Sequence, residues 1–192
     1  MTNTSTGSVY GLSISSHHAV ISVYGNNIYN LSSAGGTVIG CEAEHSLPLN
    51  IYKNKIYNLS STTASGIVYG AYIGGISYLP ITLNMYNNYI SDLKAPNASG
   101  TNAIIGIYLR GGIGGPGTIS NLYNNTVFLN AASTSTTFGT SGIFKQESPP
   151  NIGDFRNNII VNVSTPGTGG FTVAHRWSDA YNATYYASTS DK

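Results

Sequence analysis

An eight-residue phrase recurs through the chain and constrains its fold more than any other feature. It reads YGNNIYNL at 24–31, YKNKIYNL at 52–59, YNNYISDL at 86–93, YNNTVFLN at 123–130 and RNNIIVNV at 156–163. The third residue of each copy is an asparagine, and successive asparagines are 28, 34, 37 and 33 residues apart. A period of this size with unequal steps is typical of repeat proteins in which insertions fall in the loops.

A second marker, a glycine followed by a short apolar segment, alternates with the asparagine phrase. It reads GLSI at 11–14, GCEA at 40–43, GAYI at 70–73, GIYL at 106–109, GIFK at 142–145 and GFTV at 170–173. The first and third residues after each glycine are apolar except Lys145, and the residue between them is polar or aromatic. Alternation with period two predicts a strand whose first and third residues face inward.

The asparagine phrase predicts two further strands, one before and one after the asparagine. Apolar residues expected to face inward are Val23, Ile51, Met85, Leu122, Phe155, Ile28, Ile56, Ile90, Val127 and Ile160. No apolar pattern with helical period persists anywhere in the chain. We therefore expect an all-β protein, a right-handed single-stranded parallel β-helix of about five to six coils with three short strands per coil, as one domain over residues 1–192.

The repeated asparagines have a predicted structural role at the turn between two strands. Asparagine tolerates the left-handed backbone region that a sharp turn needs. Equivalent side-chain amides stacked about 4.8 Å apart can also donate to one neighbour and accept from the other. The sequence therefore predicts an internal ladder made by Asn26, Asn54, Asn88, Asn125 and Asn158.

These alternating markers carry a resemblance to a known architecture. Over about residues 8–175 the sequence resembles right-handed parallel β-helix repeat proteins of pectate-lyase-like architecture. More narrowly, it is similar to repeat segments in large secreted or surface proteins of Bacteroidetes-type bacteria. The resemblance implies a secreted or cell-surface protein, and a chain that is a segment of a longer protein or a stacking unit. It implies no single activity, because the architecture hosts lyases, glycosidases, adhesins and spacers.

Composition argues against several classes of partner and cofactor. Charged residues make up 8% of the chain, the net charge is +1, and there is no run of lysine or arginine, so we expect no nucleic-acid partner. No apolar run reaches the about 20 residues of a membrane span. One cysteine, Cys41, and the histidines His17, His18, His45 and His175 give no metal-ligand spacing, although the last two fall in one strand column. The GIGGPG segment at 112–117 precedes no helix, so no dinucleotide or other cofactor is expected.

Glu42 and Glu44 are weak candidates for catalysis. They lie two apart on one strand face, about 7 Å from each other, within the range of about 6.5–9.5 Å used by inverting glycosidases. His45 could orient one of them, but a solvated pair on a strand exterior gives the same pattern. Pectate lyases of this architecture use several aspartates to hold Ca²⁺ and an arginine as base, and no such catalytic motif can be transferred to this chain. Arg110 does share the outward column of Glu44, but it lies two coils away, with Gly74 between them.

Outward aromatic residues are the candidates for carbohydrate binding. Tyr72, Tyr108 and Phe144 follow the glycine strands, and another column contains Tyr24, Tyr52, Tyr86 and Tyr123. Aromatic faces suit sugar rings, although cross-strand stacking would place them similarly. We therefore expect a non-catalytic extracellular structural or adhesive segment that contacts polysaccharide. The alternatives are a polysaccharide lyase or glycoside hydrolase with a site near Glu42 and Glu44, and a self-assembling subunit of an extracellular filament, joined end to end.

Overall fold

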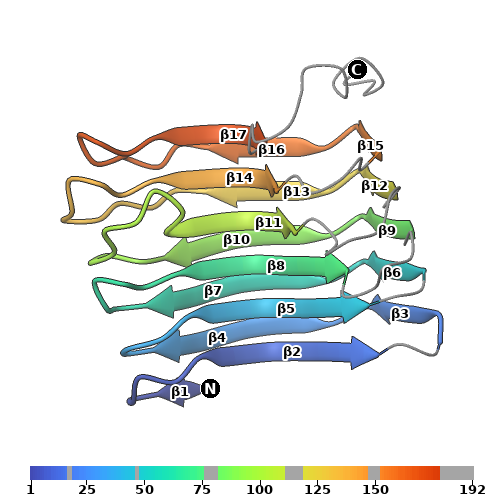
Figure 1. Cartoon of the computed structure of the whole chain (residues 1–192), viewed down its shortest axis with the longest axis horizontal. Helices are drawn as coiled ribbons and strands as arrows, with labels where there is room; N and C mark the ends of the chain where they lie inside the picture. The colour runs from blue at the N-terminus through green and yellow to red at the C-terminus, as the bar shows by residue number, and fades with distance from the viewer. Residues whose placement is uncertain (17–18, 46–47, 76–81, 111–118, 147–151, 178–192) are drawn as a thin grey trace.

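The computed structural model describes residues 1–16, 19–45, 48–75, 82–110, 119–146 and 152–177. Within these ranges the regular structure is β-strand, without a helix, and the strands form three parallel sheets (Figure 1). No described segment is a helix with the length and apolar character needed to cross a membrane. The predicted all-β fold with three strands per coil is confirmed.

Each coil contributes one strand to each sheet. Sheet A contains β1 (Thr2–Asn3), β4 (Asn27–Ser33), β7 (Lys55–Ser61), β10 (Tyr89–Lys94), β13 (Thr126–Leu129) and β16 (Ile159–Asn162). Sheet B contains β2 (Val9–Ser16), β5 (Val38–His45), β8 (Val68–Gly75), β11 (Ile104–Leu109), β14 (Thr140–Lys145) and β17 (Thr172–Trp177). Sheet C contains β3 (Ile21–Tyr24), β6 (Leu49–Tyr52), β9 (Thr82–Tyr86), β12 (Ile119–Tyr123) and β15 (Ile152–Arg156).

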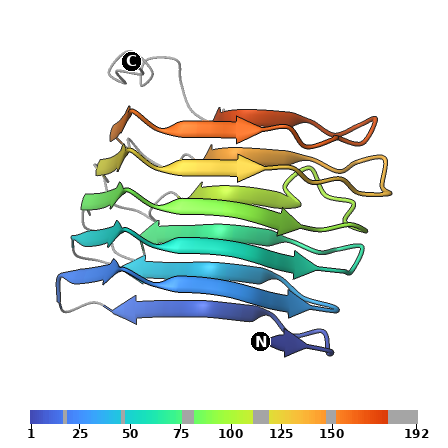
Figure 2. The same cartoon turned by 180° about the vertical axis from the view of Figure 1, so that it is seen from behind.

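The coils stack in sequence order from β2 to β17. One strand each from sheets B, C and A, in that order, completes a coil, and β17 follows the last complete set (Figures 1 and 2). Every residue therefore pairs with its equivalent one coil away: Tyr52, for example, pairs with Tyr24 on one side and Tyr86 on the other. Columns of equivalent residues result, and each column points either into the interior or outward.

The interior is apolar, as the inward columns predict. The buried residues before the asparagines are Val23, Ile51, Met85, Leu122 and Phe155. The buried residues two positions after the asparagines are Ile28, Ile56, Ile90 and Val127. Ile160, in the last complete coil, is partly buried. Cys41 is also interior, and burial, followed by the nearby charge of Glu42, raises the pKa of its thiol to about 12. Cys41 is therefore a small apolar side chain in the core.

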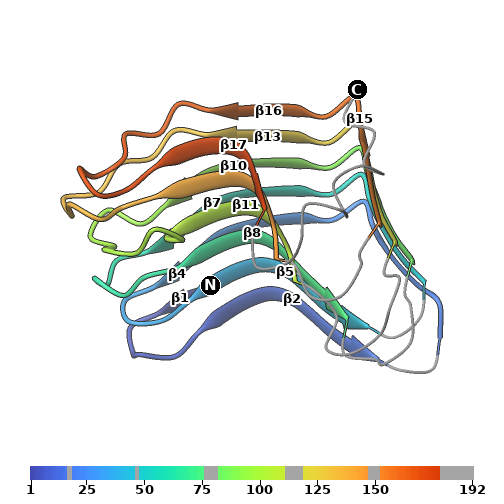
Figure 3. The same ribbon diagram turned by 45° about the horizontal axis from the view of Figure 1, so that its top comes forward.

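The strands of sheet B are bent (Figure 3), and each of β2, β5, β8, β11 and β14 contains a glycine of the repeated marker. A β-carbon on Gly70 would lie 2.6 Å from the carbonyl oxygen of Gly106 in the next coil and 2.4 Å from the Cγ2 atom of Ile90. Equally close approaches to main chain and side chain occur at Gly11, Gly40, Gly106 and Gly142. Branched side chains of sheet A, such as that of Ile90, and the main chain of the next coil therefore leave no room for a side chain at these glycine positions.

The sixth member of the glycine column is not the one that the sequence suggests. We aligned Gly170 with Gly142, with Phe171 and Val173 facing inward. The strand register instead pairs Ile143 with His175, which places Ala174 at the glycine position. That alignment is wrong because an alanine replaces the glycine in β17.

Lys145 faces the core as its column predicts, and the opposite sheet makes room for it. Its side chain is 1% exposed, and Nζ lies 4.6 Å from the centroid of the Trp177 ring. A β-carbon on Gly153 would lie 3.3 Å from that Nζ atom. In the same sheet C column, Gly153 follows Ser120, which follows Leu83, so the column becomes smaller toward Lys145.

Candidate functional site

The asparagine ladder runs through the whole stack. The Nδ2 atom of Asn54 donates to Oδ1 of Asn88 at 3.0 Å, and Nδ2 of Asn88 donates to Oδ1 of Asn125 at 2.9 Å. Equivalent bonds join Asn26 to Asn54 and Asn125 to Asn158. In each pair, the backbone N–H of the asparagine that comes first in the chain donates to the same Oδ1 atom as its side-chain amide does. The predicted ladder is confirmed, and its contacts are structural because its middle members are buried.

The left-handed backbone conformation lies one residue before the position that we predicted. Positive φ angles of 54–68° occur in the turns at Gly25, Lys53, Asn87, Asn124 and Asn157, directly before each ladder asparagine, and also at Asn30 and Asn58. The φ angle of the ladder residue itself is not positive. The turn therefore divides two tasks: the preceding residue reverses the chain, and the asparagine bonds the coils to one another.

The first aromatic column covers the outer face of sheet C. The rings of Tyr24 and Tyr52 are 4.9 Å apart with planes 3° from parallel, and those of Tyr52 and Tyr86 are 4.8 Å apart with planes 2° from parallel. Tyr123 continues the column and donates its hydroxyl to Asp154 at 2.9 Å. Because the stacked rings cover one another's faces, this column presents ring edges and hydroxyls to the solvent.

A second asparagine ladder lies beside these tyrosines, and the sequence analysis missed it. Asn84 donates its side-chain amide to Asn50 at 3.0 Å, and Asn121 donates to Asn84 at 2.9 Å. Each lies two residues before a tyrosine of the column, so the period-two pattern of the strands contains the signal. Both features stabilise the same face by contacts between coils.

The second aromatic group, on the outer face of sheet B, has a different geometry. The rings of Tyr72 and Tyr108 are 5.0 Å apart and cross at 62°. Tyr69, which the sequence analysis missed although it lies directly before the glycine, is tilted by about 30° against both. Phe144 stacks on Tyr108 and is covered by the guanidinium of Arg176, 4.0 Å from its ring centroid, so it is 7% exposed.

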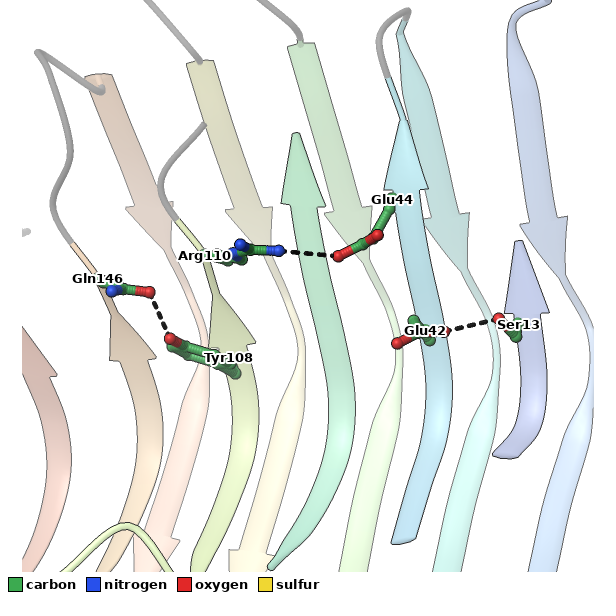
Figure 4. Close-up of polar contacts among 6 residues, drawn as sticks. All are labelled: Ser13, Glu42, Glu44, Tyr108, Arg110 and Gln146. Atoms are coloured by element: carbon green, nitrogen blue, oxygen red, sulfur yellow. Dashed lines mark hydrogen bonds and ion pairs between the residues drawn. The ribbon is translucent and has the colours of Figure 1, made fainter. Parts of the chain in front are cut away.

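Charged and polar side chains lie on the same sheet face as Tyr108 (Figure 4). Arg110 Nη1 lies 3.0 Å from Glu44 Oε1, and the pair spans the intervening strand β8. The two residues belong to strands two coils apart, but their side chains meet because Gly74, on the strand between them, has no side chain. Glu42 accepts a hydrogen bond of 2.6 Å from Ser13, and the Tyr108 hydroxyl donates to Gln146.

Burial raises the pKa of the tyrosine hydroxyls on this face. Burial, followed by the neighbouring Tyr108 and Tyr72, raises the pKa of Tyr69 to about 12. Burial also raises the pKa of Tyr72, although Arg110 opposes that shift. The face thus combines neutral hydroxyls, two carboxylates, the guanidinium groups of Arg110 and Arg176, and apolar ring surface.

The weak catalytic candidates share the outer face of sheet B, but the described residues provide no metal site. Glu42 and Glu44 alternate with the buried Ala43, as the strand pattern predicts. The backbone of His45 pairs with Gly75, and its side chain lies outside the described part of the structure. The predicted shared column of His45 and His175 is wrong, because the register places His175 opposite Ile143.

No group of three His, Cys, Asp or Glu side chains in the described ranges could hold a metal ion. His17, His18 and the GIGGPG segment at 112–117 lie outside those ranges. Comparison of the chain with protein-family models, with curated proteins and with solved structures returns no match. The parallel β-solenoid architecture is established by the sheets themselves, and the geometry of the outer faces carries the functional argument.

Proposed function

We propose that this chain is a non-catalytic, extracellular β-helical rod that contacts polysaccharide through the outer face of sheet B. The observation that carries the proposal is the crossing of the Tyr72 and Tyr108 ring planes at 62°. Phe144 stacks on one face of Tyr108, but the crossed rings of Tyr72 and Tyr108 do not cover each other as parallel rings do, so we expect ring surface of this pair to be left for the apolar face of a sugar. Both side chains are half-buried, which holds the rings in place.

The polar groups beside the rings suit sugar hydroxyls. A sugar hydroxyl both donates and accepts, and here Glu42 and Glu44 accept while Arg110 donates. Since the Arg110 and Glu44 pair is fixed at 3.0 Å beside Tyr72, these groups are oriented before a ligand arrives. The low charge of the chain, 8% of residues, favours neutral or weakly charged polymers.

The tyrosine column of sheet C is the weaker carbohydrate candidate. Tyr24, Tyr52 and Tyr86 are stacked within 3° of parallel, so each ring face of Tyr52 is covered by a neighbour. We assign this column mainly to stacking between coils, with polysaccharide contact confined to its hydroxyls and edges.

A panel of neutral and acidic polysaccharides, tested by affinity electrophoresis, checks the proposal. We expect retardation of the protein by at least one polymer, and loss of about tenfold in affinity in the Tyr72→Ala/Tyr108→Ala double variant, because both rings contribute apolar contact. The matched control is the Tyr24→Ala/Tyr52→Ala variant, which removes stacked rings from sheet C and should weaken binding much less than the sheet B variant. Unchanged affinity of a folded Tyr72→Ala/Tyr108→Ala variant would contradict the proposal.

The enzymatic alternative is supported by the contact between Arg110 and Glu44, because it brings a guanidinium and a carboxylate together on the face that also carries Glu42. A lyase or hydrolase would release unsaturated products or new reducing ends from a polymer of the same panel, and Glu42→Gln would abolish the release. We expect no product from any polymer. Turnover that Glu42→Gln removes would establish the enzyme in place of the binding rod.

A further inference from the structure

We propose that Tyr69 is the positioning residue of the sheet B site: its ring holds Tyr72 and Tyr108 in the crossed arrangement that leaves ring surface for a sugar. The inference rests on the proposed function of this face and adds the residue that makes one pair of rings suitable for it. It starts from a comparison of aromatic pairs at equivalent positions of adjacent coils. Among the described pairs of this kind, the one that crosses is also the one that a third ring contacts.

Equivalent rings on adjacent coils otherwise stack in this molecule. Parallel strands paired in register repeat a side chain at intervals of about 4.8 Å, so two rings in the same rotamer lie parallel. Three such pairs have centroids 4.8–5.2 Å apart and planes 2–4° from parallel: Tyr24 with Tyr52, Tyr52 with Tyr86, and Tyr29 with Tyr57. The step from one coil to the next therefore accounts for parallel rings without any further contact.

Sheet B contains both arrangements on neighbouring coils, which gives an internal comparison. Tyr108 pairs in register with Tyr72 on β8 and with Phe144 on β14. Its ring crosses that of Tyr72 at 62° but lies only 10° from parallel with that of Phe144. Since the strand pairing is the same on both sides of Tyr108, the pairing is not the cause of the crossing.

Tyr69 is the group that distinguishes the two sides. Its ring centroid lies 5.5 Å from that of Tyr72 and 5.3 Å from that of Tyr108, with planes tilted by 30° and 34°. A ring that packs against two others favours tilted and edge-to-face contacts over a parallel stack. The next residues of its column are Ile105 and Ser141, so this column supplies no third ring beside the stacked pair.

A shift in the alternation of β8 lets Tyr69 reach the outer face. In a regular strand, residues three apart point to opposite faces. Val68 and Ala71 are three apart and both 0% exposed, so the alternation shifts by one residue at Gly70 between them. Tyr69 and Tyr72 therefore both point outward, although they are also three apart, and their rings meet.

The hydroxyl contacts of the two crossed rings do not account for their angle. Arg110, one coil beyond Tyr72, lies near its hydroxyl and opposes the rise that burial causes in its pKa. Gln146, one coil beyond Tyr108, accepts a hydrogen bond from that hydroxyl. Both hydroxyls are thus directed to a residue of the next coil, and an equal displacement leaves two rings parallel. The contact with Tyr69 is the one that differs.

Tyr69→Ile tests the proposal, because isoleucine already occupies this column on both sides, as Ile39 and Ile105. In a crystal structure of the variant, we expect the angle between Tyr72 and Tyr108 to fall from 62° to about 10°, as in the stacked pair that Tyr108 forms on its other side. Affinity electrophoresis should show a loss of about fivefold in affinity for the polymer that the wild type binds. Tyr69→Phe keeps the third ring and should retain both the angle and the affinity.

The two readouts separate this inference from the proposed function. A folded Tyr69→Ile variant whose rings stay crossed would overturn the positioning role, whatever its affinity, and parallel rings with unchanged affinity would overturn the link between angle and binding. If no polymer retards the wild type, the proposed function fails, whereas the crystal structure still decides whether Tyr69 sets the angle. Tyr69→Leu, which also lacks a ring, should behave as Tyr69→Ile does. Gln146→Ala is the control and should leave the rings crossed.

Discussion

Two corners of the coil keep the repeats in register by opposite means. At the glycine corner of sheet B, the close approach of main chain from the next coil, 2.5–2.6 Å from where a β-carbon would be, excludes any side chain. At the asparagine corner, a side chain is required, because it supplies the bonds of 2.9–3.0 Å that join consecutive coils. The glycine corner requires that no side chain be present, and the asparagine corner requires a side-chain amide.

This difference teaches how each corner should respond to change. An added methyl group at the glycine corner collides with backbone on one side and with a branched side chain on the other, so the loss of stability is steep. A lost amide at the asparagine corner removes hydrogen bonds one at a time, so the loss depends on how many the residue makes. The predictions below test this comparison.

The largest effect is expected at the glycine corner. Gly70→Ala should lower the free energy of unfolding by more than about 3 kcal/mol, because its β-carbon would lie 2.6 Å from the Gly106 carbonyl oxygen. Gly25→Ala is the matched control: nothing lies within 4 Å of its β-carbon, and its φ of 68° should cost only about 1 kcal/mol. Urea denaturation measures both, and similar losses would contradict steric exclusion.

The asparagine corner should give the next largest effect. Asn88→Ala removes its bonds to Ile51 and Asn125 and leaves the backbone N–H of Asn54 without an acceptor, so we expect a loss of about 3 kcal/mol. Asn26→Ala, at the exposed end of the ladder, should cost about 1 kcal/mol. If the two variants unfold at the same urea concentration, the ladder does not act through the number of its bonds.

An effect that is absent at neutral pH is expected from the thiol in the column next to the glycines. The pKa of Cys41 rises from the ordinary value of 9.0 to about 12 in the folded chain, chiefly through burial. Since the folded state holds this proton more tightly, stability should fall as the pH rises from about 9 to about 12. Cys41→Ala, with the residue that Ala71 already has in this column, should show a shallower fall. Equal slopes in chemical denaturation at several pH values would rule out this contribution.

The smallest loss of stability is expected in the tyrosine column on the outer face of sheet C. Tyr52→Ala removes two stacked contacts, at 4.9 and 4.8 Å, and should cost about 1 kcal/mol or less. Tyr52→Phe keeps both rings in contact and should be neutral within error of thermal denaturation. A cost for Tyr52→Phe as large as that for Tyr52→Ala would show that the hydroxyl, and not the stacked ring, stabilises the column.

Much of the fold was predictable from the sequence because both corners repeat a recognisable residue. The period-two pattern beside each glycine and asparagine predicted three strands per coil and the burial of residues such as Ile51 and Met85. The sixth coil was misaligned because Ala174 replaces the glycine, so the pattern matched Gly170 by letters alone. The left-handed residue was misplaced because several of the turns contain two asparagines, and sequence does not say which one turns the chain.

The candidate site was less predictable than the fold. Its residue columns followed from alternation, but the reach of Arg110 over Gly74 to Glu44 depends on side-chain length and on the missing side chain between them. The crossed pair Tyr72 and Tyr108 also contacts Tyr69, whose ring centroid lies 5.5 Å from that of Tyr72 and 5.3 Å from that of Tyr108. Parallel columns look alike in sequence, and only ring orientation distinguishes the sheet B group from the sheet C column.

The space that Gly153 leaves for Lys145 has a consequence for how this molecule can change. Within one coil, the long side chain of Lys145 from sheet B faces Gly153 of sheet C. The core volume between the two strands, which follow each other in the chain, is therefore filled almost entirely from one of them. Replacing β14 alone with an earlier sheet B strand would leave a hole beside Gly153, and replacing β15 alone would overfill the core. The exchangeable module is therefore a whole turn of the solenoid, and recombination within a turn would join halves that do not fit.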